Sequence, residues 1–199
     1  MTPLLIATSN AGKLREIRDI LRDVPFALRT LADLLPIDEP EETGATFEAN
    51  ALLKARYYAG ATGLLTVADD SGLVDDALDG APGVLSARFP GDTYEAKFAH
   101  MFALLDAKGV ETSPARFVCA LALVRGGEVV FEARGVVEGE ITRRPRGTHG
   151  FGYDPIFYHP PFGLTLAEVP LARKREVSHR GKAFEQLREF LGAAGRLLA

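Results

Sequence analysis

The stretch Leu64-Leu65-Thr66-Val67-Ala68-Asp69-Asp70-Ser71-Gly72-Leu73 joins an apolar run to two adjacent carboxylates. Its first five residues predict a buried strand, which we expect to end at the aspartates, before a Ser-Gly turn. Because successive strand side chains point to opposite faces, only one aspartate can be the main functional group, and we favour Asp70. A carboxylate in this position can bind Mg²⁺ or deprotonate a water molecule, although such a string taken alone is more often a solvated turn.

Upstream of this stretch, the sequence predicts a helix that begins near Thr46. Thr46, Asn50 and Lys54 recur every four residues, so their side chains share one polar stripe of that helix. The stripe could line a site, or it could be an ordinary solvated face. Before the helix, carboxylates gather in the segment 36–42, which ends at Glu42 and which alone is more often a solvated loop.

The N-terminus has the layout of a phosphate site. A short apolar strand at residues 4–7 leads into a helix through the small polar loop Thr8-Ser9-Asn10-Ala11-Gly12-Lys13. Ser9 or Asn10 can cap the helix, whose free amides favour an anion, and Lys13 adds a positive charge that the helix dipole disfavours unless an anion lies nearby. The P-loop signature is not met, because its first glycine is missing and Leu14 follows the lysine.

Downstream of the central stretch, a loop that contains Arg88 precedes an amphipathic helix over residues 94–108. Two long apolar segments follow, at 115–124 and 128–141, joined by Gly126-Gly127. A Gly-Gly pair between such segments is a strong hairpin signal, so part of the sheet is antiparallel. The fold class is therefore α/β with a mixed sheet.

The loop at residues 147–155 holds three glycines, two aromatic residues and an aspartate. This composition suits a ligand pocket, because glycine lets a substrate approach the backbone and an aromatic face can stack on a base. The alternative is a plain turn before a strand at 156–158. Further on, Ser178 can cap a C-terminal helix, leaving His179 and Arg180 at a second N-terminus that favours anions. The apolar side of that helix carries Phe184, Leu187, Leu191 and Leu198.

Composition limits the classes of function. With 199 residues, 47% of them hydrophobic, the chain can bury the core of one large domain or of two fused lobes. A formal net charge of −4 argues against a protein that coats nucleic acid or an anionic membrane. The single cysteine, Cys119, lies in an apolar run and is expected in the core. No signal-like or membrane-spanning stretch is evident, so we expect a cytoplasmic protein. A calcium-loop interpretation of the aspartates at 69–79 fails on spacing.

Several separated motifs, taken together, resemble the inosine triphosphate pyrophosphatase family, the bacterial dITP/XTP pyrophosphatases. The resemblance spans nearly the whole chain and is carried by Thr8 to Lys13, Glu41 to Gly44, Phe47 to Lys54, Ala68 to Leu73, Gly80 to Arg88, Gly150 to Pro155 and Ser178 to Gly181. It implies one domain over residues 1–199, with two lobes around a long mixed sheet and an active-site cleft between them. It also implies hydrolysis of ITP, dITP or XTP to monophosphate and pyrophosphate, Mg²⁺ as cofactor, and a homodimer.

The resemblance assigns roles to individual positions. It implies that Asp70 is the proton acceptor, that Glu42 and Asp70 bind Mg²⁺, and that the phosphates are held by Thr8, Ser9, Asn10, Ala11, Gly12 and Lys13. The further substrate contacts would be Ser71, Phe151, Gly152, Tyr153, Asp154, Lys174, His179 and Arg180. Supporting roles are expected for Asn50, Lys54, Asp69 and Arg88. Ser9 departs from the glycine of many members, which is expected to alter loop hydrogen bonds without loss of function.

Three other functions compete with this one. A nucleotide sensor would bind without turnover, but it would have little use for the acids Glu42 and Asp70 without a metal. A P-loop NTPase that releases orthophosphate is disfavoured by the failed motif after Ala7. A house-cleaning pyrophosphatase with a different base preference remains an alternative that the residues alone do not exclude.

Overall fold

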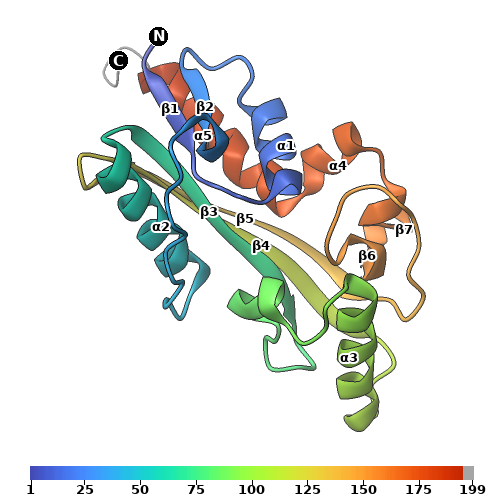
Figure 1. Ribbon diagram of the computed structural model, residues 1–199. Helices are drawn as coiled ribbons and strands as arrows, with labels where there is room; N and C mark the ends of the chain where they lie inside the picture. Colours follow the sequence, from blue (N-terminus) through green and yellow to red (C-terminus); the bar gives the residue numbers. More distant parts are fainter. Residues whose placement is uncertain (195–199) are drawn as a thin grey trace. The chain divides into compact units, whose positions relative to one another are not determined.

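The computed structural model describes residues 1–194 and contains a seven-stranded mixed sheet with flanking helices (Figure 1). The strand order is β2-β1-β3-β4-β5-β6-β7. The strands are β1 (Pro3–Ile6), β2 (Ala27–Thr30), β3 (Leu65–Asp75), β4 (Ser113–Arg125), β5 (Glu128–Ile141), β6 (Phe157–His159) and β7 (Leu164–Thr165). The α-helices are α1 (Ala11–Ile20), α2 (Phe47–Thr62), α3 (Tyr94–Ala107), α4 (Leu171–Val177) and α5 (His179–Ala194). Short 3₁₀ helices are η1 (Leu31–Asp33), η2 (Gly83–Arg88), η3 (Asp154–Ile156), η4 (Pro160–Phe162) and η5 (Leu166–Glu168).

The mixed character of the sheet follows from its pairings. Strands β1 and β2, and β1 and β3, are parallel, whereas β6 is antiparallel to both β5 and β7. Neighbouring strands β4 and β5 are joined by Gly126 and Gly127, both at positive φ, as a two-residue hairpin turn requires. The predicted hairpin and the predicted mixed α/β fold are confirmed.

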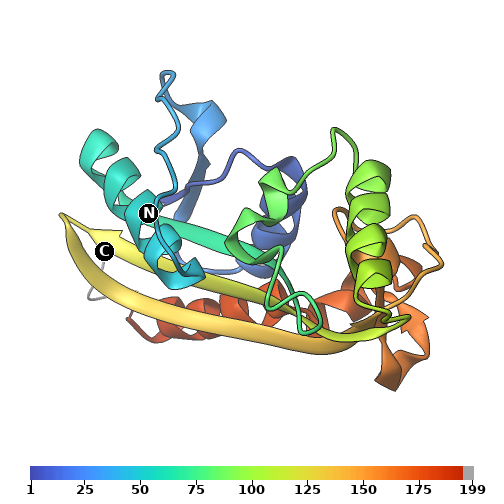
Figure 2. The ribbon, with the colours of Figure 1, turned by 90° about the horizontal axis from the view of Figure 1, so that it is seen from below.

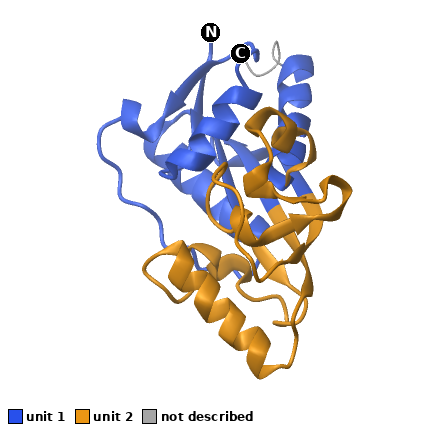
Figure 3. Ribbon diagram, turned by 90° about the vertical axis from the view of Figure 1, so that its right-hand side faces the viewer, with its two compact units in different colours: residues 1–70, 119–135, 179–199 blue, residues 71–118, 136–178 orange. Residues whose placement is uncertain are grey.

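The chain forms two compact units (Figure 3). Unit 1 comprises residues 1–70, 119–135 and the chain from 179 onward, and unit 2 comprises residues 71–118 and 136–178. Strands β3, β4 and β5 contribute residues to both units. Within residues 1–194, no helix is both long enough and apolar enough to span a bilayer.

Unit 1 has three layers, because its strands are apolar on both faces. On one face, α1 and α5 pack on residues such as Leu4, Ile6 and Val67. On the other face, α2 packs on residues such as Leu5 and Ala68. Figure 2 shows α2 and α5 on opposite sides of the central strands. This alternation continues to the end of the apolar run and decides which helix each aspartate faces.

Unit 2 has its own core, in which α3 packs on the distal halves of the long strands. Its buried residues include Leu73, Phe98, Met101, Phe117 and Phe157. The predicted helix at 94–108 is confirmed as α3. The C-terminal helix is confirmed as α5, with Phe184, Leu187 and Leu191 buried, whereas Leu198 lies outside the described residues.

One prediction about the central stretch is wrong. The strand does not end at the two aspartates, and Ser71-Gly72 is not a turn, because β3 continues to Asp75. Apolar residues resume at Leu73, which is completely buried. Both carboxylates are compensated by partners on the neighbouring helices, so the strand can carry them without reaching solvent.

Candidate active site

The loop after β1 is organised by the N-cap of α1. The side-chain oxygen of Asn10 accepts a hydrogen bond from the backbone amide of Lys13 at 3.0 Å. The backbone amide of Asn10 donates to Thr8 Oγ1 at 3.3 Å. Of the two capping candidates, Asn10 is therefore the cap, and Ser9 is exposed beside it. The loop, including Ala11 and Gly12 in the first turn of α1, presents the free amides of a helix N-terminus.

Asp69 faces α1 and α5 and forms an ion pair with Lys13. Lys13 Nζ lies 3.1 Å from Asp69 Oδ2, and the Asp69 side chain is 1% exposed. Burial by itself would raise the pKa of Asp69, but the charges of Lys13, Arg180 and Lys54 outweigh it and lower that pKa to about 2. The anion that Lys13 was expected to require is thus supplied by the protein itself. Cys119 lies on the same face, with Sγ 3.8 Å from Asp69 Oδ2, and is buried as predicted.

Arg180 completes this charge cluster from the first turn of α5. Its Nη1 donates to Glu16 Oε2 at 2.6 Å, and its Nε lies 3.7 Å from Asp69 Oδ2. Glu16 is a site residue that the sequence analysis missed. Its spacing carried the signal, because Lys13, Glu16 and Ile20 follow one another at intervals of three and four on α1 and so share its inward face. His179, the residue before Arg180, is also buried.

Asp70 faces α2 on the opposite side of the sheet. Asn50 Nδ2 donates to Asp70 Oδ2 at 3.0 Å, and Lys54 Nζ lies 3.7 Å from Asp70 Oδ1. The Lys54 ammonium also donates to Glu42 Oε1 at 2.5 Å. Burial raises the pKa of Asp70 more than Lys54 and Asn50 lower it. The residues of the predicted stripe thus have two roles. Thr46 caps α2, whereas Asn50 and Lys54 contact the carboxylates of Asp70 and Glu42.

The donor set at this place fits Mg²⁺. Two carboxylates, from Glu42 and Asp70, already converge on one cation, the ammonium of Lys54. Mg²⁺ is commonly held by one or two carboxylates, with water and substrate phosphates completing its coordination. Among residues 1–194, no group of three or more His, Cys, Asp or Glu side chains converges on one point. The arrangement therefore suits a metal shared with a phosphate ligand better than a closed protein cage.

In unit 2, the loop at 150–154 is held by a buried ion pair. Lys174 Nζ donates to Asp154 Oδ2 at 2.6 Å, and both side chains are 3% exposed. The same Asp154 oxygen accepts from the Phe151 amide at 2.9 Å. The Lys174 ammonium also lies 5.3 Å from the centre of the Phe151 ring. Asp154 and Lys174 thus fix the position of the half-buried Phe151.

Tyr153 is buried in the core of unit 2, so its ring does not present the open aromatic face that the loop composition suggested. The residue is 4% exposed, and its hydroxyl donates to the Ser86 carbonyl at 2.9 Å. Gly152, just before it, has a φ of 68°, which a side chain would strain. Tyr153 therefore anchors the loop in the core of unit 2. Ser71, predicted at a turn, is instead a half-buried residue within β3.

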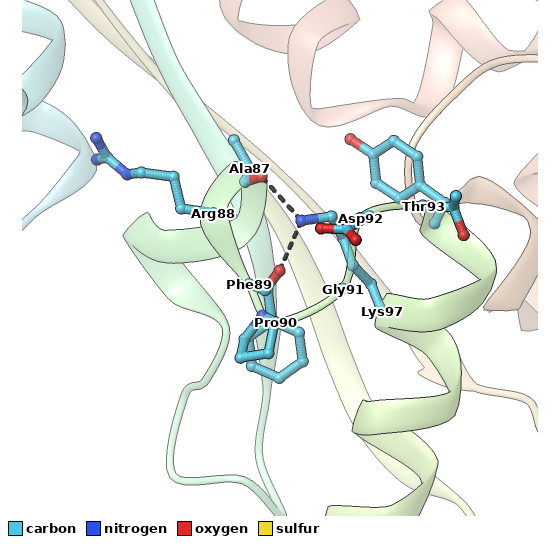
Figure 4. A pocket seen from close by; sticks show the side chains of 9 residues that line it. Ala87, Arg88, Phe89, Pro90, Gly91, Asp92, Thr93 and Lys97 are labelled. Carbon is cyan, nitrogen blue, oxygen red and sulfur yellow. Dashed lines mark hydrogen bonds between the residues drawn. The ribbon is translucent and has the colours of Figure 1, made fainter.

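Arg88 lies beside an open pocket of about 550 Å³ in unit 2 (Figure 4). Lys97 Nζ donates to the carbonyl oxygens of Ala87 and Phe89, the two residues that flank Arg88, at 3.0 and 2.6 Å. Figure 4 shows the Arg88 side chain extending away from that ammonium. Lys97 therefore fixes the backbone on both sides of Arg88, and so the direction in which the Arg88 side chain points.

The chain is similar to known proteins over nearly its whole length. The family model of the Ham1 family matches residues 4–190. The dITP/XTP pyrophosphatase of Geobacter sulfurreducens is 49% identical over 98% of this chain and 99% of its own length. That of Listeria monocytogenes is 46% identical over 96% and 95%. A HAM1 protein from Coxiella burnetii superposes with a TM-score of 0.90 at 41% identity, covering 98% of this chain and all of the other.

Proposed function

The chain belongs to the Ham1 family, and from that premise we propose how its residues carry out the reaction of its relatives. Curated relatives are named dITP/XTP pyrophosphatases and match at nearly full length. The chain is accordingly a nucleoside-triphosphate pyrophosphatase that hydrolyses noncanonical purine nucleoside triphosphates, such as ITP, dITP and XTP, to monophosphate and pyrophosphate. This reaction removes those nucleotides before they enter DNA or RNA.

The observation that carries the mechanism is the division of the two aspartates between two faces of the sheet. Asp69 is engaged by Lys13, whereas Asp70 is held by the amide of Asn50 close to the carboxylate of Glu42. We assign proton abstraction from the attacking water to Asp70, with attack at the α-phosphorus and pyrophosphate as the leaving group. Lys13 and the amides at the N-terminus of α1 neutralise charge on the phosphates.

Mg²⁺ is proposed as the cofactor, held by Glu42 and Asp70. When bound, it would neutralise charge on the triphosphate and so favour attack at phosphorus. Lys54, which contacts the same two carboxylates, holds them close together. In unit 2, Phe151, Gly152, Asp154 and Lys174 are proposed substrate contacts, whereas the buried side chain of Tyr153 is proposed to support the loop.

Two further proposals concern the setting of the enzyme. We propose a homodimer, on the ground of the family resemblance. We also propose the cytoplasm as its place of action, because the nucleotides that polymerases draw on are found there. Native mass spectrometry tests the first, and fractionation of cells that produce the protein tests the second.

The function is tested by chromatography of the products after incubation with Mg²⁺ and, separately, ITP, XTP, ATP, GTP and dTTP. Monophosphate and pyrophosphate from ITP and XTP, with little from ATP or GTP, are expected. Diphosphate and orthophosphate would contradict the proposed attack at the α-phosphorus. Preferred turnover of dTTP would favour a house-cleaning enzyme of another base preference, and binding without turnover would favour the sensor.

A further inference from the structure

Asn50 lies between the proposed base and the loop that carries Glu42. Asn50 lies in the first turn of α2 and is 1% exposed. A buried amide must satisfy both its donor and its acceptor, so its partners are informative. From those partners we infer that Asn50 is a positioning residue, which fixes Asp70 and the Glu42 loop relative to each other. This inference rests on the proposed function, because it assigns Asn50 a part in that reaction.

The two ends of the Asn50 amide have partners of opposite kinds. Its Nδ2 donates to Asp70 Oδ2 at 3.0 Å, and its Oδ1 accepts from the Gly44 amide at 2.7 Å. A rotated amide would place its oxygen against the Asp70 carboxylate and its NH₂ group against the Gly44 N–H. Both contacts would then be repulsive, so the hydrogen-bonding pattern determines the orientation of this side chain.

The loop approaches Asn50 so closely that only glycine fits at position 44. A Cβ atom added to Gly44 would lie 2.5 Å from Asn50 Oδ1 and 2.8 Å from the Ala49 Cβ. Gly44 lies two residues after Glu42, so tying its amide to Asn50 limits where the Glu42 carboxylate can reach. The same side chain therefore restrains the loop at Gly44 and the strand at Asp70.

The hydrogen bond from Asn50 also distinguishes the two oxygens of Asp70. Oδ2 is held by the neutral amide, while Oδ1 is the oxygen near the Lys54 ammonium. Fixing Oδ2 orients the plane of the carboxylate, and the direction of Oδ1 follows from it. A proton acceptor must be placed to within a fraction of an ångström, and a misplacement of about 1 Å can cost about a hundredfold in rate.

The test begins with Asn50→Ala. We expect its kcat for ITP to fall about ten- to a hundredfold while KM changes less than threefold, because Lys13 and the α1 loop are untouched. Glu48→Gln serves as the control, since Glu48 lies on the same helix and makes an exposed ion pair with Arg134. An Asn50→Ala enzyme with kcat within twofold of the parent would overturn the inference.

A second pair of variants separates positioning from folding. In Asn50→Asp, the Gly44 contact can persist, but two carboxylates would face each other at residues 50 and 70, so both stability and kcat should fall. The double variant Asn50→Asp/Asp70→Asn restores a carboxylate–amide pair with the two groups exchanged. It should regain stability in urea denaturation but no turnover. Failure to regain stability would contradict the contact between Asn50 and Asp70.

These readouts also keep two failures apart. If the parent protein released no pyrophosphate from ITP, the proposed function would fail, and with it the kinetic role of Asn50. The stability comparison between Asn50→Asp and the double variant needs no substrate, so it would still decide whether the two side chains are linked as described.

Discussion

The neighbouring residues Asp69 and Asp70 have different roles because successive side chains of a strand point to opposite faces of the sheet. Asp69 continues the face of Val67 and meets the cations of α1 and α5, whereas Asp70 continues the face of Ala68 and meets α2. The alternation was predictable from the sequence, and the choice of Asp70 as the base stays a prediction. The partners were not, because they come from helices whose packing only the folded chain defines.

Asp70→Asn tests the role of the proposed base. The substitution keeps the size and shape of the side chain but removes the proton acceptor and one charge, so turnover of ITP should fall by at least about a hundredfold. Urea denaturation should show a folded protein. Asp23→Asn, at an exposed position after α1, is the matched control and should keep full activity. Turnover near that of the parent in Asp70→Asn would remove Asp70 from the mechanism.

Lys13→Ala tests the phosphate loop. Loss of a charge-assisted hydrogen bond to phosphate should weaken inhibition by pyrophosphate about ten- to a hundredfold. Arg18→Ala, an exposed cation in the last turn of the same helix, should leave the inhibition constant unchanged. If Lys13→Ala bound pyrophosphate as tightly as the parent, Lys13 would serve only as the partner of Asp69.

At the scale of elements, a close approach in unit 1 joins β5 to α5 at Gly135. A Cβ atom on Gly135 would lie 2.0 Å from the His179 carbonyl oxygen and 2.7 Å from the Ala183 amide. Gly135→Ala must therefore separate the strand from the helix, and we expect a loss of about 1–3 kcal/mol in the free energy of unfolding. Because α5 begins at His179, the variant should also lower turnover.

Gly60→Ala is the control for that substitution. Gly60 lies within α2, and among the described residues no atom beyond its chain neighbours and its own helix backbone lies within 4 Å of an added Cβ. Alanine is a better helix former, so this variant should gain about 0.5–1 kcal/mol. Urea denaturation of both variants under the same conditions compares their free energies of unfolding. Equal changes in that free energy at the two positions would contradict the packing of α5 on β5.

Elements were predictable where a local signal is strong, such as the Gly-Gly pair of the hairpin or the spacing of residues in α2, α3 and α5. They were not predictable where tertiary partners decide. The sequence Asp-Asp-Ser-Gly has the composition of a turn, yet β3 runs through it because helices compensate both acids. Glu16 was missed although its spacing on α1 carried a signal, and the partner of Tyr153 in the core was not predictable, because only the folded chain defines it.

At the scale of the whole molecule, stability should depend on pH through Asp75. This carboxylate in unit 2 is fully buried; its Oδ1 accepts from Ser113 and Leu78, whereas its Oδ2 has no hydrogen-bond partner among the described residues. Burial raises its pKa despite those hydrogen bonds. A raised pKa means that the stabilising contribution is complete below the unfolded value and is lost as the pH rises through the folded value.

Comparison with Asp75→Asn isolates this contribution, because the other titrating groups are common to both proteins. The free energy of unfolding of the parent, relative to that of Asp75→Asn, should increase as the pH falls from 7 to 4. Urea denaturation at several pH values measures the difference. A difference that did not change with pH would show that Asp75 does not titrate in this range.

The central claim is that water attacks the α-phosphorus, and the position of an isotope tests it most directly. ITP is hydrolysed with Mg²⁺ in ¹⁸O-labelled water, and the products are separated and analysed by mass spectrometry. Attack at the α-phosphorus predicts one ¹⁸O atom in the monophosphate and none in pyrophosphate. Label in pyrophosphate, with unlabelled monophosphate, would place the attack at the β-phosphorus and contradict the account.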